Sequence, residues 1–303
     1  MIIPEGFPGL PSSFEFTTQV VQSTDGEHSL FFNIFKKKGT APKRGLLIVH
    51  GQGEHGGRYQ HFPHYLQEEY DLFLAPDLRG HGRSEGIRGH VDSFEEYVDD
   101  ALLAWNALRS KLGEGGVADW FAHSMGGAVT LLATQESSDL GIRNLMLSSP
   151  CLGLTVEVPM VKDIAARILS RVWGSLQMGT GLNSGVMSHD PAVAAAIERD
   201  SLHHTKATPK FYLDFVAAME RIRETQLEIP AQTRVLFQLA GDDRVVSTPA
   251  SERVFDKLAH PDKKKIVYPG LFHEIFNEQN KEQIFRDLLD WLRLGPSVKG
   301  RAV

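Results

Sequence analysis

Ser124 is the residue whose surroundings point most directly to chemistry, and it lies in the run WFAHSMGG at residues 120–127. The residues before it predict a short buried strand and those after it an apolar helix. In such a turn small neighbours let strand and helix pack closely. The serine hydroxyl then projects above the sheet, near a helix N-terminus that favours developing negative charge. The pattern A-x-S-x-G, with Ala122 and Gly126 at the small positions, predicts a nucleophilic serine; the alternative is an ordinary glycine-containing turn.

A nucleophilic serine needs a base to take its proton and an acid to orient that base. With this order of elements, the acid and then the histidine follow at the carboxyl ends of later strands. His260 precedes the last predicted strand, whereas His273 follows it, so His273 is predicted to be the base. The strand before that one ends in two adjacent carboxylates, Asp242 and Asp243, and we choose Asp243 as the acid.

Alternating strands and helices must position these residues. The predicted strands are 14–20, 29–35, 45–49, 72–75, 116–121, 144–148, 233–239 and 265–268. Asp25-Gly26 favours a hairpin between the first two, and the later strands are apolar runs separated by helices. Ser93 and Glu96 predict a capping box for one of these helices. The alternation indicates an α/β fold with a mostly parallel central sheet and helices on both faces.

This alternation is interrupted between Pro150 and Ile229, where no buried strand is predicted. Helical patterns occur instead at 160–173, 191–199 and 209–225. We therefore expect three segments: residues 1–150 as the first part of the core, 151–230 as an inserted helical cap, and 231–303 as the second part of the core.

Length and composition exclude several classes of protein. A chain of 303 residues with 42% hydrophobic and 23% charged residues can bury a sizeable core. The formal net charge is -6 and there is no basic tract, so we expect no nucleic-acid partner. The single cysteine, Cys151, fits a reducing compartment. With neither a signal-peptide pattern nor a membrane-spanning run, we expect a cytoplasmic protein that at most binds a membrane surface.

The histidines do not suggest a metal site, because His81 and His90 lack carboxylate or cysteine neighbours at metal-ligand spacing. No metal and no cofactor are therefore expected.

Residues 50–59 form a glycine-rich loop after a buried strand, and in isolation this loop could be only a tight turn. Glu54 and Arg58 within it are predicted to form a structural ion pair.

Five runs together carry a family resemblance: the loop 50–59, the turn 77–84, the serine turn, the run DRVV at 243–246 and the run HEIFNE at 273–278. Over nearly its whole length the chain resembles the monoacylglycerol lipase and lysophospholipase family of α/β-hydrolases. The resemblance implies an α/β-hydrolase fold with Ser124 as nucleophile, Asp243 as acid and His273 as base. It also implies that the backbone N–H groups of Gln52 and Met125 form the oxyanion hole. Ala122 departs from the glycine usual in the family, and the short spacing after Gly241 keeps Asp242 open as the acid.

The resemblance implies a serine carboxylic-ester hydrolase that cleaves single-chain lipid esters through an acyl-enzyme, with monoacylglycerol as the expected substrate and no cofactor. Lysophospholipase activity, general carboxylesterase activity and acyl transfer would use the same residues and stay open. A non-enzymatic binding protein of this fold would be expected to lack part of the triad. Related dehalogenases and epoxide hydrolases would have Asp in place of Ser124. The oligomeric state is left open.

The helix expected at 160–173 has two interpretations. Val161, Ile164, Ile168, Leu169 and Val172 follow helical spacing and form an apolar stripe. The stripe could pack on the core. Alternatively, it could line an acyl tunnel or rest on a lipid surface, with basic residues toward anionic head groups.

Overall fold

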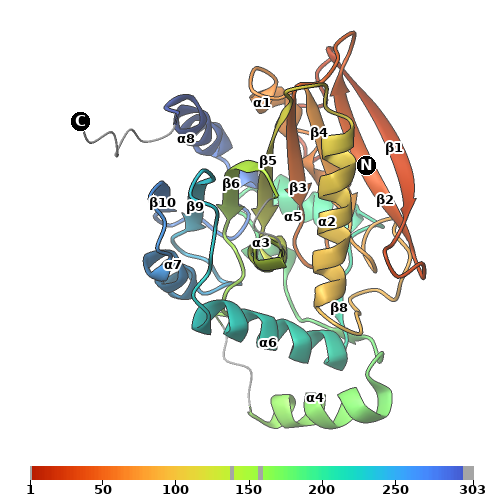
Figure 1. Cartoon of the computed structure of the whole chain (residues 1–303). Helices are drawn as coiled ribbons and strands as arrows, with labels where there is room; N and C mark the ends of the chain where they lie inside the picture. The colour runs from red at the N-terminus through yellow and green to blue at the C-terminus, as the bar shows by residue number, and fades with distance from the viewer. Residues whose placement is uncertain (1, 137–139, 156–159, 296–303) are drawn as a thin grey trace.

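The computed structural model describes residues 2–136, 140–155 and 160–295. Its centre is an eight-stranded sheet in the order β1-β2-β4-β3-β5-β6-β9-β10 (Figure 1). The strands span Phe14–Gln22, Ser29–Lys37, Arg44–Val49, Leu72–Asp77, Val117–His123, Ile142–Ser148, Arg234–Ala240 and Lys263–Tyr268 for β1, β2, β3, β4, β5, β6, β9 and β10. β2 pairs antiparallel with β1 and β4, and all other neighbours are parallel. The predicted α/β fold with a mostly parallel sheet is confirmed.

Helices cover both faces of the sheet, because its central strands are apolar on both sides. The helices outside the insertion are η1 (Gly56–Tyr59), α1 (Phe62–Leu66), α2 (Glu95–Ser110), α3 (Met125–Glu136), α7 (Thr248–Lys257), η3 (Ile275–Asn277) and α8 (Lys281–Arg293). On one face Trp105 of α2 stacks on Trp120 of β5, with ring centroids 5.3 Å apart. On the other face Phe285 of α8 packs against Phe62 of α1. The two apolar layers hold the sheet rigid between them.

The capping box predicted at the start of α2 does not form. The Ser93 hydroxyl lies 3.4 Å from the backbone nitrogen of Glu95. Glu96 does not reach back to complete the box; its carboxylate pairs with the Arg79 guanidinium at 3.0 Å. A contact with a residue of another loop therefore replaces the local one.

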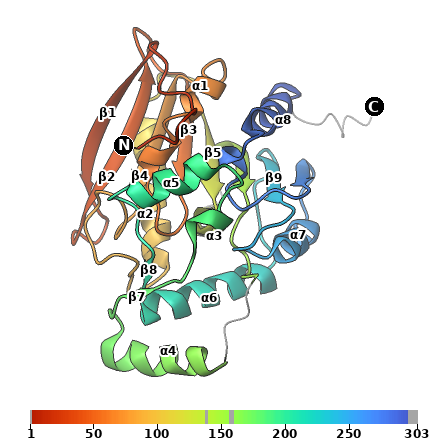
Figure 2. The same cartoon turned by 180° about the vertical axis from the view of Figure 1, so that it is seen from behind.

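The insertion between β6 and β9 contains α4 (Met160–Trp173), β7 (Met178–Gly179), η2 (Ser184–Val186), α5 (Pro191–Arg199), β8 (Lys206–Ala207) and α6 (Pro209–Glu224). The three predicted helices occur within a residue of their predicted bounds. The pair β7–β8 was not predicted, because two-residue strands are too short to show a period. α6 crosses the sheet and α4 lies beyond it, farther from the strands (Figures 1 and 2). The division at residues 150 and 230 stays a prediction.

The apolar stripe of α4 does not pack on the core. Ile164, Ile168 and Val172 expose 49%, 60% and 81% of their surface, and Trp173 at the end of the helix exposes 60%. The side chain of Val161 lies outside the described residues. No helix in the described part of the chain is long and apolar enough to cross a membrane.

Candidate active site

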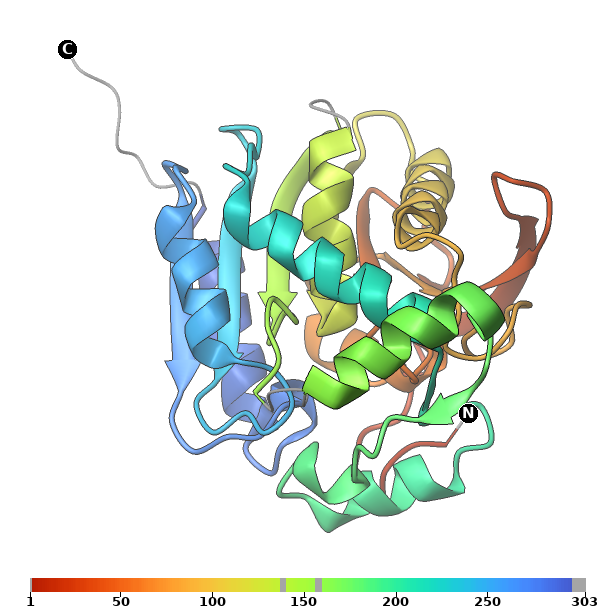
Figure 3. The ribbon, with the colours of Figure 1, turned by 90° about the horizontal axis from the view of Figure 1, so that it is seen from below.

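The loops that follow β3, β5, β9 and β10 meet at the carboxyl edge of the sheet, where the insertion crosses it (Figure 3). Open parallel sheets bind their ligands at this edge, because the connections on either side diverge there. Each of the four loops carries one or more of the residues selected from the sequence.

Ser124 lies between β5 and α3 with a backbone φ of 53°, a left-handed conformation that residues other than glycine rarely adopt. The close approach of the turn explains its small residues. A Cβ added at Gly126 would lie 2.4 Å from the carbonyl oxygen of Val49, and one at Gly127 would lie 2.5 Å from Pro150. Ala122 is fully buried in the strand before the turn. The strained serine and its glycines form the sharp junction that the pattern predicts.

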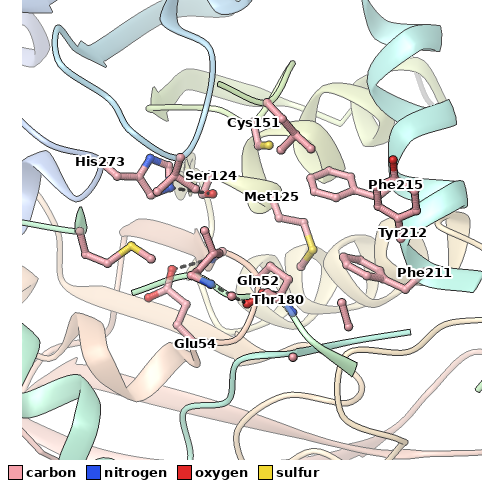
Figure 4. Close-up of a pocket in the computed structure, with 18 of the residues that line it drawn as sticks. Gln52, Glu54, Ser124, Met125, Cys151, Thr180, Phe211, Tyr212, Phe215 and His273 are labelled. Atoms are coloured by element: carbon pink, nitrogen blue, oxygen red, sulfur yellow. Dashed lines mark hydrogen bonds between the residues drawn. The ribbon is translucent and has the colours of Figure 1, made fainter. Parts of the chain in front are cut away.

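The structure brings the three residues selected from the sequence together. The Ser124 Oγ lies 2.9 Å from Nε2 of His273, and Nδ1 of the same imidazole lies 2.7 Å from Oδ2 of Asp243. The Ser124–His273 contact is drawn in Figure 4. The imidazole and the Asp243 carboxylate are both nearly fully buried. This geometry lets His273 accept a proton from Ser124 while Asp243 holds the opposite ring nitrogen.

The two adjacent carboxylates have different surroundings. The second oxygen of Asp243 accepts hydrogen bonds from the backbone N–H groups of Val245 and Val246, each at 2.9 Å. Asp242 points outward, is half exposed, and pairs with Arg244 at 3.2 Å. Burial acts to raise the pKa of Asp243, but the neighbouring His273 and these N–H donors lower it overall. Asp243 is therefore the carboxylate with a stable anion facing His273.

Two neighbouring histidines differ in their tendency to carry charge. Burial disfavours a charged His273, but the Asp243 carboxylate outweighs this effect and raises its pKa. The ring of His123 lies 4.7 Å from that of His273, and burial, together with the charge that His273 can carry, lowers the pKa of His123 to about 4. Of these two imidazoles, His273 is the one poised to take up a proton near neutral pH.

Gln52 and Met125, implied as oxyanion donors by the family resemblance, both line the cavity that contains Ser124. Met125 is the first residue of α3, so its N–H has no partner within the helix. Gln52 follows β3 in the glycine-rich loop, and Gly51 beside it approaches Ser124 closely: a Cβ added there would lie 3.0 Å from the Ser124 Cβ. Both residues therefore lie in the wall of the cavity near Ser124, and their role as oxyanion donors stays a prediction.

A buried ionic network supports the glycine-rich loop. The predicted pair is confirmed, since the Arg58 guanidinium lies 2.9 Å from Glu54. Sequence reasoning missed that Arg58 also binds both oxygens of Glu274, the residue after His273, at 2.9 and 2.8 Å. Glu54 in turn accepts the Gly51 N–H at 2.6 Å and the Tyr59 hydroxyl at 2.9 Å. Arg58 thus joins the loop after β3 to the loop that carries the histidine.

Glu278 is a second residue that sequence reasoning quoted but gave no role. Its buried carboxylate accepts the Phe272 N–H at 2.9 Å, next to His273 in the chain. It also accepts hydrogen bonds from the cap: the His189 N–H at 3.0 Å, the His189 ring at 2.9 Å and the Ser188 hydroxyl at 3.3 Å. The run HEIFNE therefore contains two carboxylates that anchor the histidine loop, Glu274 and Glu278.

A cavity of about 500 Å³ opens beside Ser124 and extends under the cap. Apart from the polar groups near Ser124, much of its wall is apolar, and Phe211, Tyr212 and Phe215 of α6 form one side (Figure 4). Cys151 and Met125 line it near the serine. Cys151 is buried, and its place in the cavity wall was not predicted.

Within the described residues, no group of three or more histidine, cysteine, aspartate or glutamate side chains is arranged to hold a metal ion. Of the expected structural histidines, His81 is fully buried beside His50, with ring centroids 5.2 Å apart. His90 contacts the Thr208 hydroxyl at 2.9 Å, which attaches the cap to the core.

Comparisons with known proteins agree with the fold of the chain. A protein-family model described as "Serine aminopeptidase, S33" matches residues 40–280. The chain is 30% identical over 256 residues to phospholipase YtpA of Bacillus subtilis (strain 168), covering 82% of this chain and 95% of that protein. It is 28% identical to the monoacylglycerol lipase of Mycolicibacterium smegmatis, covering 90% and 99% of the two chains. The crystal structure of Paleococcus ferrophilus monoacylglycerol lipase is similar, with a TM-score of 0.73, 26% identity and coverage of 92% and 98%.

Proposed function

Because the chain belongs to the serine hydrolase family described as serine aminopeptidase S33, and is an α/β-hydrolase, we propose that it hydrolyses esters of single-chain lipids, with monoacylglycerol as the preferred substrate. The observation that carries the proposal is an apolar cavity of about 500 Å³ beside the Ser124–His273–Asp243 array. A volume of this order accommodates small-molecule ligands, and apolar walls favour an acyl chain. The lipase and phospholipase relatives support the same substrate class.

In the proposed reaction the Ser124 Oγ attacks the ester carbonyl carbon while His273 Nε2 takes the hydroxyl proton. Asp243 holds the Nδ1–H and stabilises the imidazolium. The tetrahedral intermediate collapses, the C–O bond to the alcohol breaks, and His273 donates its proton to the leaving oxygen. Water, deprotonated by His273, then attacks the acyl carbon. The bond from this carbon to Ser124 Oγ breaks, His273 returns the proton to Oγ, and the fatty acid leaves.

The oxygen of the tetrahedral intermediate gains negative charge, and the N–H groups of Gln52 and Met125 are the proposed donors to it. The N-terminus of α3 adds its positive end at the same point. Loss of one such donor typically costs about 3 kcal/mol of transition-state stabilisation. The backbone of the glycine-rich loop is therefore part of the proposed machinery.

The family's descriptive name raises peptidase activity as an alternative, and the charges of the cavity oppose it. An aminopeptidase must bind a protonated amine, which favours an unpaired carboxylate near the scissile bond. Among the described residues that line the cavity the carboxylates are Glu54 and Glu274, and both pair with Arg58. We therefore expect the site to bind an uncharged acyl chain more tightly than a cationic terminus.

We also propose that the exposed stripe of α4 contacts the lipid surface from which substrate enters. Ile164, Ile168 and Val172 are exposed on this helix, and Arg167 and Arg171 lie among them. Apolar side chains interleaved with basic ones are typical of helices that lie at a membrane interface.

A fluorophosphonate probe tests the nucleophile. Peptide mapping should find the label on Ser124 alone, and Ser124→Ala should abolish both labelling and ester hydrolysis. Label on another serine would overturn the assignment.

A panel of monoacylglycerols, lysophospholipids and aryl esters with varied chain length tests the substrate. Preference for lysophospholipids would favour the phospholipase alternative, which the relative from Bacillus subtilis supports.

A further inference from the structure

The glycine-rich loop has a contact across the cavity that the proposed function does not require. The side-chain amide of Gln52 donates a hydrogen bond to the backbone carbonyl of Lys206, at 2.6 Å. One residue further, the carbonyl of Gly53 accepts the backbone N–H of His204, at 2.8 Å. Both partners belong to the cap, in the segment 204–206 that leads into β8, which we call the cap strap. The strap therefore binds the loop whose backbone is the proposed oxyanion donor.

The contact is close enough to fix the loop. Gly53 has a φ of +81°, and a Cβ added there would lie 2.2 Å from the carbonyl oxygen of His204. On the other side of Gln52, the Gly51 N–H is bonded to Glu54 at 2.6 Å. The peptide group that carries the Gln52 N–H also contains the Gly51 carbonyl, which lies 2.7 Å from Nδ1 of His50 in the core. The Gly51 N–H before this peptide is thus bound to the core, and the Gly53 carbonyl after it is bound to the cap.

The strap is itself anchored to the core. The His204 ring contacts the carbonyl of Gly80 through Nε2 at 3.1 Å, and its Nδ1 accepts the N–H of Lys206 at 3.2 Å. These two bonds require a neutral ring with its proton on Nε2. Burial lowers the pKa of His204 to about 4, so the ring stays neutral at physiological pH. Thr208 beyond the strap donates its N–H to the carbonyl of Gly89, at 3.0 Å.

We propose that the cap strap is a working part of the oxyanion hole, and that the Gln52 side chain is a positioning residue that orients its own backbone N–H through Lys206. This inference rests on the proposed function. A preorganised donor stabilises developing charge only if it already points at the oxyanion position, so its orientation matters more than its presence. The cap then serves catalysis directly as well as covering the acyl cavity.

The test is Gln52→Met, which keeps the backbone N–H and the side-chain length but removes the donor to Lys206. We expect kcat for a soluble short-chain ester to fall about tenfold, a part of the roughly 10²–10³-fold that loss of a donor costs. KM should change less than about twofold, because the ground-state carbonyl depends little on the hole. Affinity for a trifluoromethyl ketone transition-state analogue should fall by the same factor as kcat/KM.

The matched control is Gln226→Met. The Gln226 amide donates to the carbonyl of Lys257 at 3.4 Å, a bond of the same kind between cap and core that touches neither the glycine-rich loop nor the cap strap. It should leave kcat and analogue affinity unchanged. A second variant, Gln52→Glu, turns the donor into a carboxylate that repels the Lys206 carbonyl, and should lose at least as much activity as Gln52→Met.

All variants are first titrated with the fluorophosphonate, so that rates refer to functional Ser124. If the wild type neither labels at Ser124 nor cleaves esters, the proposed function fails. If it does both, and Gln52→Met keeps the wild-type kcat or raises KM alone, the positioning role is wrong and the proposed function stands. A loss of kcat in Gln226→Met equal to that in Gln52→Met would also overturn the proposal, because any weakening of the contact between cap and core would then suffice.

Discussion

Two parts of the insertion differ in how they are attached to the core. The part around α5 and β8 is bound by buried polar contacts: His55 pairs with Asp200 at 2.9 Å, Glu278 binds Ser188 and His189, and the cap strap binds the glycine-rich loop. We call residues 184–208 the clamped part. These three contacts involve the glycine-rich loop and the loop that carries His273, so we expect a displacement of the clamped part to disturb the chemistry.

α4 is attached differently. It packs against α6, and its described ion pair is internal, between Arg167 and Asp163 at 2.8 Å. Its apolar residues Ile164, Ile168 and Val172 face outward. In Figures 1 and 2 it lies beyond α6, farther from the strands. From this comparison we propose that one part of the insertion serves the reaction and the other serves access of the substrate.

The largest effect on kcat is expected from substitution of Asp243, one of the two adjacent carboxylates Asp242 and Asp243. Asp243→Asn should lower kcat by roughly 10⁴-fold, because the amide cannot hold the reactive tautomer of His273. Asp242→Asn is the matched control and should change kcat little, since Asp242 is half exposed and pairs only with Arg244 among the described residues. Steady-state kinetics on a soluble ester measures both. A reversed order would identify Asp242 as the acid.

The pH dependence of kcat/KM gives the next effect. His273 must be neutral to act as base, so activity falls about tenfold per pH unit below its pKa. The Asp243 carboxylate raises this pKa, so the midpoint of the acid limb should lie above the ordinary value of about 6.5. Asp243→Asn removes the charge and should move the midpoint of its residual activity to lower pH, whereas Asp242→Asn should not. The same midpoint in all three proteins would contradict the assigned charge interaction.

Much of the fold and of the candidate site follows from local sequence. The continuous apolar strands, the small residues around Ser124 and the order of acid and histidine after it lie in short runs with a physical reason for each. The serine, histidine and aspartate selected in this way lie within hydrogen-bond distance, although their roles stay predictions.

The rest depends on residues far apart in the sequence, which no local pattern encodes. Arg58 and Glu274 are separated by 216 residues, and Glu278 meets Ser188 across 90. The predicted capping box does not form for the same reason, since the Glu96 carboxylate pairs with Arg79, a residue of another loop. Periodicity identified the apolar stripe of α4 but could not say that Ile164, Ile168 and Val172 are exposed while Leu169 is half-buried. Long-range pairing of polar groups is therefore what the sequence left undetermined.

A smaller effect on turnover is expected from weakening the contacts of Glu278 with the clamped part. Glu278→Gln replaces a buried carboxylate that accepts four hydrogen bonds with an amide that has one acceptor oxygen. The free energy of unfolding should fall by about 2 kcal/mol. Turnover of short-chain and long-chain esters should fall by the same factor. The exposed Glu282→Gln should change stability by less than about 0.5 kcal/mol. Thermal denaturation and kinetics on both esters measure the result, and loss with only the long-chain ester would contradict the comparison.

The smallest effect on the enzyme itself is expected at α4, and it separates the two parts of the insertion most clearly. Ile168→Asp or Ile164→Asp adds a charge to a side chain that is already 60% or 49% exposed, so the melting temperature should stay within about 2 °C. Hydrolysis of a soluble short-chain ester should be unchanged, because neither residue lines the cavity. Turnover of a long-chain monoacylglycerol in vesicles should slow several-fold, because a carboxylate at a lipid-facing position opposes burial in the interface. Glu198→Gln on the exposed surface of α5 is the control for charge change on the clamped part and should affect neither substrate. If both substrates and the melting temperature fall together in the α4 variants, the stripe packs against protein and does not contact lipid.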